Sequence, residues 1–322
     1  MKVLSDMSAE RTYSNYFRPA LLVVLILGAV FALASTLAFS SVSARADDGR
    51  FAGGTGTAND PYQIATAAQL ENLANWVNDG KSSNKDHYVL ANIDLKGSSY
   101  SANNTVIGYA DSFKDASTHG FKGTFDGNGY TIKNLNVDLS KVTAKGGTVT
   151  VGLFGAVQNA TIKNLNLQDV VFVGAVPKAV SYDIAVGCLA GAVFGKTVID
   201  HCSVMNGSIT ENTTGAGTAT KLYSFGGLLG DAYTTGETAF ASVTNCSIDC
   251  EITAFGGHSS QSYVGGIVGR GRVNSNDNRW RAVEVGLSAF TGTLKGNGYN
   301  APIIAGVRRG ASESAAPGTA IA

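Results

Sequence analysis

The acidic residues in the second half of the chain are the first candidates for chemistry. Cleavage of a glycosidic bond needs two carboxyl groups roughly 5 to 10 Å apart, but these acids lie in separate segments: Asp183, Asp200, Asp231 and Asp249. Asp126 belongs to an Asp-Gly-Asn-Gly turn, where Asp has a structural role. Asp200 aligns with Lys163 of the preceding segment, which predicts an exposed ion pair of little energetic value. The carboxylates therefore predict no catalytic residues.

Histidine and cysteine patterns would reveal a metal site. The histidines are His87, His119, His201 and His258. None forms HExxH, and we interpret each as a solvated loop or turn residue. The cysteines, Cys188, Cys202, Cys246 and Cys250, include no CxxC pair. The segment 53–58 resembles a calcium-binding nonapeptide, but Ala58 replaces the liganding Asp. No metal site and no cofactor is predicted.

One arginine-rich stretch could recognise a ligand. It comprises Arg270, Arg272, Arg279, Trp280 and Arg281. Arginine grips carboxylates in a bidentate manner, and Arg and Trp are favoured at binding hot spots. A solvated turn with Trp280 folded over one end of the protein is the alternative interpretation. We expect a ligand-binding loop for carboxylated sugars here, with the plain turn as its competitor.

The first segment is typical of export. Lys2, Arg11 and Arg18 precede an uncharged apolar run over residues 20–39, and Ala44-Arg45-Ala46 matches a small-x-small cleavage pattern. This predicts a signal peptide over residues 1–46. The run is also long enough for a retained membrane anchor, which would be the protein's contact with a membrane. The remainder is expected outside the cytoplasm.

The composition argues against a nucleic acid as the partner and favours a strand-rich fold. Lys plus Arg and Asp plus Glu balance at 24 each, whereas nucleic-acid binders need a basic surplus. With 40 Gly and only 5 Pro, the chain suits stacked strands and turns better than helices.

A repeat organises the mature part. A Gly-apolar-apolar-Gly core recurs over residues 151–155, 187–191, 226–230 and 265–269, with Val151 in place of the first glycine and final glycines 36 to 39 residues apart. The repeat-core glycines are Gly152, Gly155, Gly187, Gly191, Gly226, Gly230, Gly265 and Gly269. Period-2 strands follow, as in residues 161–167 and 243–248. One such unit cannot bury its apolar face alone, so the copies must stack.

The cores resemble the GLUG motif of bacterial surface proteins, some of which are attached to IgA-peptidase-like proteins. Residues 121–135 are similar to the segment that commonly precedes GLUG repeats, and residues 53–70 resemble the usual lead-in. The resemblance covers most of residues 53–297 and implies a right-handed parallel β-helix. The peptidase activity of some relatives is not carried over, because its zinc-binding motif is missing.

The domain plan follows from the repeat. Residues 47–105 are expected to form a strand-helix-strand cap, in which Thr66 and Gln69 make a capping box. Residues 106–304 form the all-β parallel β-helix, and residues 305–322 a flexible tail. Cys202 and Cys246 occupy the slot of Leu165, so they should face inward on neighbouring turns, as free core thiols or as a disulfide.

Two functions from different classes remain open. The first is an exported, non-catalytic protein, secreted or at the cell surface, whose β-helix serves adhesion or spacing and whose partners are host or microbial glycans or surface proteins. The second is a carbohydrate-active β-helix enzyme, a polysaccharide lyase or hydrolase, which rests on analogy of fold. A third possibility is that the chain is a fragment of a larger surface protein.

Overall fold

Stacked parallel strands form the body of the protein. The computed structural model describes residues 49–112, 114–145, 148–176, 183–212, 222–234, 236–255, 261–273, 281–309 and 316–317. Residues 46–322 form one compact unit, and the predicted signal segment lies outside the described residues. Among the described residues, no helix is both long and apolar enough to cross a membrane.

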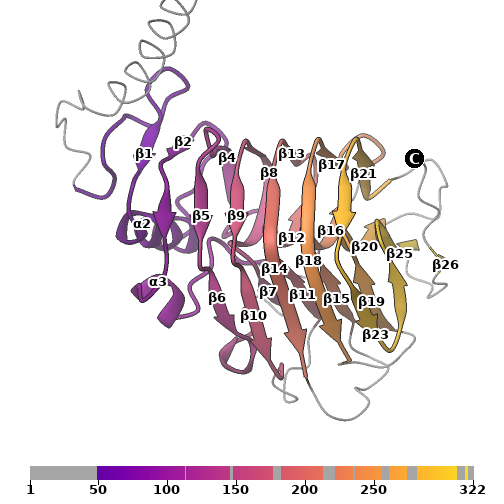
Figure 1. Cartoon of the computed structure of the whole chain (residues 1–322). Coiled ribbons are helices and arrows are strands. Elements are labelled where there is room, and N and C mark those ends of the chain that lie inside the picture. Colours follow the sequence, from indigo (N-terminus) through magenta and orange to yellow (C-terminus); the bar gives the residue numbers. More distant parts are fainter. Residues whose placement is uncertain are drawn as a thin grey trace, which may run out of the picture. The chain divides into compact units, whose positions relative to one another are not determined.

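Three sheets run along the stack (Figure 1). Sheet 1 contains β1 (Tyr62–Ile64), β2 (His87–Leu90), β4 (Phe121–Asp126), β8 (Phe154–Lys163), β12 (Ala190–Phe194), β13 (Val198–Asp200), β16 (Leu229–Thr234), β17 (Ala241–Thr244), β20 (Val268–Val273), β21 (Val283–Gly286), β25 (Ile304–Arg309) and β26 (Ala316–Pro317). Sheet 2 contains β3 (Ile93–Asp94), β5 (Thr131–Lys133), β6 (Asn136–Asp138), β9 (Asn166–Gln168), β10 (Val171–Gly174), β14 (Ser203–Glu211), β18 (Ser247–Ala254), β22 (Ala289–Thr291) and β23 (Leu294–Gly296). Sheet 3 contains β7 (Thr148–Val151), β11 (Asp183–Gly187), β15 (Tyr223–Gly226), β19 (Ser262–Gly265) and β24 (Tyr299–Ala301).

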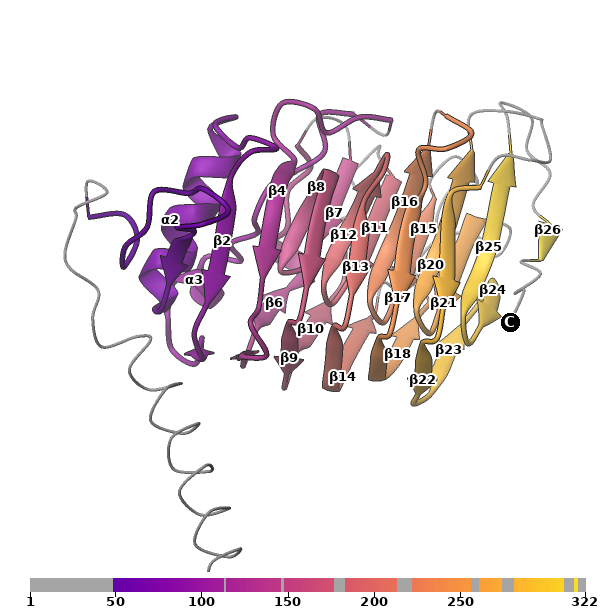
Figure 2. The ribbon, with the colours of Figure 1, turned by 90° about the horizontal axis from the view of Figure 1, so that it is seen from above.

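From β4 onward each turn of the chain visits all three sheets, and successive turns pair in parallel, with register shifts in the β4–β8 and β14–β18 pairs (Figure 2). Equivalent residues therefore stack on one another. Along sheet 1, Ile162, Ile199, Val243 and Val285 follow one another in pairing register. In β18, Ile248, Cys250 and Ile252 are buried while the residues between them are exposed, the period-2 alternation of a half-buried strand. The predicted all-β parallel β-helix is confirmed, and its handedness stays a prediction.

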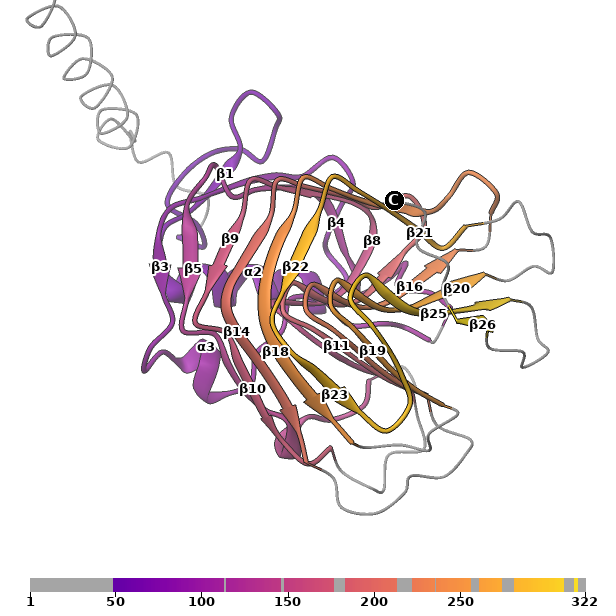
Figure 3. The same cartoon turned by 45° about the vertical axis from the view of Figure 1, so that its right-hand side comes forward.

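The repeat glycines let two sheets touch through their backbones. A Cβ added to Gly230 would lie 2.5 Å from the Val186 nitrogen and 2.6 Å from the Gly191 oxygen. Gly191 meets β7 in the same way, and Gly269 meets β15. Sheets 1 and 3 thus pack with almost no side chain between them at these positions, and their far ends project together on one side of the stack (Figure 3). We call this double layer, β11, β15 and β19 against β12, β16 and β20, the arm.

A strand-helix-strand cap precedes the first complete turns. Helix α2 (Ala67–Asn78) begins at Thr66, whose side chain accepts a hydrogen bond from the Gln69 nitrogen at 3.2 Å. The Gln69 side chain accepts from the Ala65 nitrogen at 2.8 Å. The buried face of α2 consists of Leu70, Leu73, Ala74 and Val77. The capping box and helix are therefore present as predicted. Helix α3 (Ser99–Ala102) and the 3-10 turn η1 (Leu139–Lys141) follow.

Two boundaries differ from expectation. The second strand of the expected strand-helix-strand cap is divided into β2, in sheet 1, and β3, in sheet 2, because the chain turns a corner between them. At the other end, β25 crosses the boundary expected at residue 304 and pairs with β20 through Arg309. The two-residue strand β26 pairs antiparallel with β25 and occupies part of its outer edge.

Asparagine and aspartate side chains hold the corners between sheets 1 and 2. Asn245 adopts φ 54°, a left-handed conformation that Asn tolerates better than most residues. Its Nδ2 donates to Asp200 Oδ1 of the previous turn at 2.8 Å, and Thr244 Oγ1 donates to the same atom. Hydrogen bonds from Asn245 first, then from His201 and Thr244, lower the pKa of Asp200 to about 2. The ion pair expected between Lys163 and Asp200 is wrong, because Lys163 pairs with Asp126 at 3.1 Å.

We expect Gly230→Ala to destabilise the protein by roughly 1–3 kcal/mol or more, because the new methyl group meets backbone atoms that cannot move aside. Urea denaturation followed by circular dichroism measures this. Gly286→Ala is the control, since a Cβ there meets only the Thr244 methyl carbon at 3.9 Å. Equal midpoints for the two variants would contradict the close packing of sheets 1 and 3.

We expect Asn245→Gly to raise the pKa of Asp200 toward its unfolded value of roughly 3.9, because the first hydrogen bond on its carboxylate is removed. Glycine keeps the left-handed φ, so the change tests the amide alone. Since the folded pKa is depressed, the bonds stabilise the fold above about pH 4 and lose this effect as pH falls toward 2. Carboxyl NMR titration is the measurement. Asn206→Gly is the control, because Asn206 bonds to Asp169 instead.

Candidate functional site

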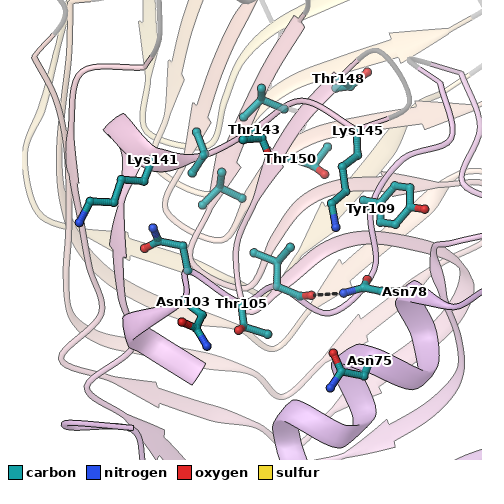
Figure 4. A pocket seen from close by; sticks show the side chains of 15 residues that line it. Asn75, Asn78, Asn103, Thr105, Tyr109, Lys141, Thr143, Lys145, Thr148 and Thr150 are labelled. Carbon is teal, nitrogen blue, oxygen red and sulfur yellow. Dashed lines mark hydrogen bonds between the residues drawn. The ribbon is translucent and has the colours of Figure 1, made fainter. Parts of the chain in front are cut away.

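A polar pocket lies where the cap meets the first turns of the β-helix. Its volume is about 260 Å³, and its wall is built from α2, the segment after α3, residues 141–145 and β7 (Figure 4). Asn78 holds this wall together: its Nδ2 donates to the Val106 oxygen at 3.1 Å, and its Oδ1 accepts from the Gly108 nitrogen at 2.9 Å. Asn104 Oδ1 accepts from the Asp138 nitrogen at 2.9 Å. These two amides are structural parts of the pocket.

A lysine and a tyrosine form the upper side of the pocket. The Lys145 Nζ lies 4.8 Å from the centroid of the Tyr109 ring, close enough for a cation–π interaction. The other partner of this ring is His119, stacked on it at 4.4 Å, and the His119 imidazole pairs with the Asp111 carboxylate. Burial, and then the charge of Asp111, raises the pKa of Tyr109. The phenol is therefore protonated at neutral pH and can donate a hydrogen bond.

The pocket favours an anion and offers no pair of carboxylates. No Asp or Glu is among the described residues that line it. Lys141, at its edge, pairs with Asp138 at 3.2 Å and is largely exposed. The hydroxyl of Thr148 is buried and has no hydrogen-bond partner among the described residues, an unusual state for a buried polar atom. Sequence reasoning missed this site, because its residues come from three segments without a recognisable motif.

Two residues of the predicted arginine loop belong to a strand instead. Arg270 and Arg272 belong to β20 and are buried, Arg270 completely. Arg281 is exposed and pairs with Glu284 at 3.5 Å. Arg279 and Trp280 lie outside the described residues. The expected exposed cluster is thus split, and its two buried members point into the arm rather than toward solvent.

Inside the arm, the two arginines share two carboxylates. Asp231 Oδ2 lies 2.5 Å from Arg270 Nη2 and 2.8 Å from Arg272 Nη2. Asp183 Oδ2 lies 3.7 Å from Arg270 and 3.6 Å from Arg272. Burial opposes ionisation of Asp231, but the charges of Arg270 and Arg272 outweigh it and lower its pKa. The expectation that these acids are scattered is wrong for Asp183 and Asp231, because stacking brings different repeats together.

Aromatic rings flank this cluster. Arg270 Cζ lies 5.5 Å from the centroid of the Tyr263 ring, and Arg272 Cζ lies 5.1 Å from that of Tyr233. Asp231 and Arg270 are register partners on β16 and β20, while Asp183 lies on β11 of sheet 3. The cluster therefore links the two layers of the arm with charge-assisted contacts, and two positive charges meet two negative charges.

The cysteines lie in the core. All four are buried free thiols, and Cys202 and Cys246 occupy inward positions on neighbouring turns, as predicted. The hydrogen bond to Cys246, followed by burial, raises the pKa of the Cys202 thiol. A second pair was not foreseen: Cys188 Sγ lies 3.9 Å from Cys250 Sγ. Among the described residues, no group of three or more His, Cys, Asp or Glu could hold a metal ion.

No protein-family profile matches the chain. Halomucin of Haloquadratum walsbyi is 28% identical over 238 residues, which cover 67% of this chain but 2% of halomucin. A protein of Evansella cellulosilytica named "Putative Gly-rich membrane protein" is 32% identical over 164 residues, 50% of this chain and 16% of that protein. The chain therefore corresponds to a small part of either relative.

One solved structure aligns with most of the chain, at a low score. The crystal structure of a "putative immunoglobulin A1 protease" from Bacteroides ovatus aligns over 81% of this chain and 87% of the other, with 14% identity and a TM-score of 0.33. A likeness at this level carries no argument about function.

We expect Asp231→Asn to destabilise the protein by about 3–5 kcal/mol, because it leaves two buried guanidinium groups with too little negative charge. Urea denaturation at neutral pH measures the change. The matched control is Glu284→Gln, which breaks the exposed pair with Arg281 and should cost at most about 1 kcal/mol. If Asp231→Asn is as mild as the control, the cluster does not support the arm.

Proposed function

We propose that this chain is an exported, non-catalytic interaction module, secreted or held at the cell surface, in which the β-helix is a rigid scaffold for adhesion or spacing. The observation that carries the proposal is the state of its carboxylates. Asp183 and Asp231, the acids from different repeats that stacking brings to one cluster, are held by Arg270 and Arg272.

Glycosidic cleavage needs a different arrangement. A general acid must keep its proton near the working pH and must reach the substrate. Asp231 has a lowered pKa and is buried, so it meets neither condition. Asp126 and Asp200 likewise accept hydrogen bonds from the corner asparagines. The pocket beside the cap offers amides, hydroxyls and ammonium groups but, among its described lining residues, no pair of carboxyl groups of the kind that cleaves a glycosidic bond.

The similarities support the proposed location. The signal pattern over residues 1–46 and the GLUG-like cores both favour an exported surface protein. One relative is named a membrane protein and the other halomucin. Partners are proposed to be glycans or surface proteins of host or microbial cells.

We expect the purified protein to be retained on at least one member of an immobilised panel of polysaccharides and surface glycans, with no release of reducing or unsaturated ends. Retention and new chain ends are measured in the same samples, with heat-unfolded protein as the control. Cleavage of any panel member would overturn the non-catalytic assignment. Absence of retention on every member would contradict a glycan-binding role and leave spacing or protein contact.

A further inference from the structure

We propose that the pocket beside the cap binds a single carboxylated sugar residue, a hexuronate, with Lys145 pairing its carboxylate and side-chain amides holding its ring hydroxyls. This inference rests on the proposed function, because it names the ligand class of a non-catalytic glycan-binding module. It places the binding site at the cap, whereas the sequence had pointed to the arginine stretch.

The charge of the pocket selects an anion. Among the described residues, no carboxylate pairs with Lys145, whose side-chain contact is the face of Tyr109. Lys141 differs, since its ammonium already pairs with Asp138 at 3.2 Å. In Figure 4 the Lys145 ammonium points into the space above Asn78, while the Lys141 side chain extends away from it. A cation in a partly enclosed space without a carboxylate attracts a negative ligand.

The amides divide into structural and available groups. Asn78 and Asn104 are engaged with backbone atoms. Asn75, on α2, and Asn103, after α3, line the same pocket, and no side-chain hydrogen bond from either is found within the described residues. An amide presents donors and an acceptor side by side, which matches a hydroxyl on a sugar ring. The pocket therefore keeps two groups suited to hydroxyls in addition to its cation.

Thr148, on β7, has a buried hydroxyl without a hydrogen-bond partner in the described structure. The residue is only 3% exposed. A buried polar atom without a partner is unfavourable by roughly 1–3 kcal/mol in general. Figure 4 shows this hydroxyl directed away from the space between Lys145 and Asn78, so the contacts proposed for the ligand come from Lys145, Asn75 and Asn103.

The size limits the ligand to one sugar residue. A volume of about 260 Å³ lies below the roughly 300–1,000 Å³ of typical small-molecule sites. Val106 and Val149 line the pocket with apolar surface, against which the C–H face of a sugar ring can pack. A uronate supplied as a free sugar and one at the end of a chain present the same chemistry, so the test must separate them.

The test uses isothermal titration of the full protein with methyl glucuronide, methyl glucoside and a glucuronate-terminated trisaccharide. We expect methyl glucuronide to bind at least tenfold more tightly than methyl glucoside, and the advantage to fall with added NaCl, because an ammonium–carboxylate pair is screened. If the pocket takes a chain end, the trisaccharide binds at least as tightly as the monosaccharide. If it takes the free sugar, only the monosaccharide binds. Binding of neither uronate overturns the proposal.

Variants locate the site. Lys145→Gln should weaken uronate binding roughly tenfold or more while leaving the weak glucoside binding unchanged. Lys141→Gln is the matched control and should change it less than about threefold, because Lys141 is exposed and already paired. Unchanged thermal melting shows that both variants are folded. Uronate affinity unaltered in Lys145→Gln overturns the site, and retention of that same protein on the glycan panel would show that the proposed function survives without it.

Discussion

Sheets 1 and 3 touch backbone to backbone at the repeat glycines. At Gly191, Gly230 and Gly269 there is no room for a Cβ, because the space is filled by main-chain atoms of the neighbouring sheet. This contact fixes how far the arm can open and keeps successive turns in register. Because neighbouring turns pair in register, a residue repeated every 36 to 39 positions lies beside the equivalent residue of the next turn. A repeat that lost these glycines would have to separate its sheets and open the core.

The pairing register also determines which charged residues become neighbours. Asp231 and Arg270 come from neighbouring repeats, and the ladder sets them side by side within a layer that excludes water. Their charges then serve to hold the arm together. At the corners, Asp200 and Asn245 meet in the same way but at the surface, where hydrogen bonds rather than burial determine the properties of the carboxylate. The pairing of successive turns thus produces both the buried ionic cluster in the arm and the exposed hydrogen bonds between side chains at the corners.

The pocket exists because the cap differs in structure from the turns that follow it. Helix α2 has no counterpart among the described residues of the later turns, so residues on it face residues of β7 without repetition. Where identical turns meet, side chains interlock and leave little space. Where the helix meets the first turns, Asn75 and Lys145 border a hollow instead. A binding site at the junction of a repeat and its cap is therefore a consequence of mismatch, which a uniform β-helix would not provide.

Local periodicity and equivalent positions in successive repeats were enough to predict the parallel strand stack, the capped helix from Ala67 to Asn78 and the inward positions of Cys202 and Cys246. The sequence could not show that Arg270 is buried, since an arginine next to glycines and a second arginine looks solvated until a partner such as Asp231 is placed opposite it. Nor could it assemble the pocket around Lys145, whose walls are contributed by segments more than sixty residues apart. Contacts of that kind are set by how the cap docks on the first turns, and only the tertiary structure decides them.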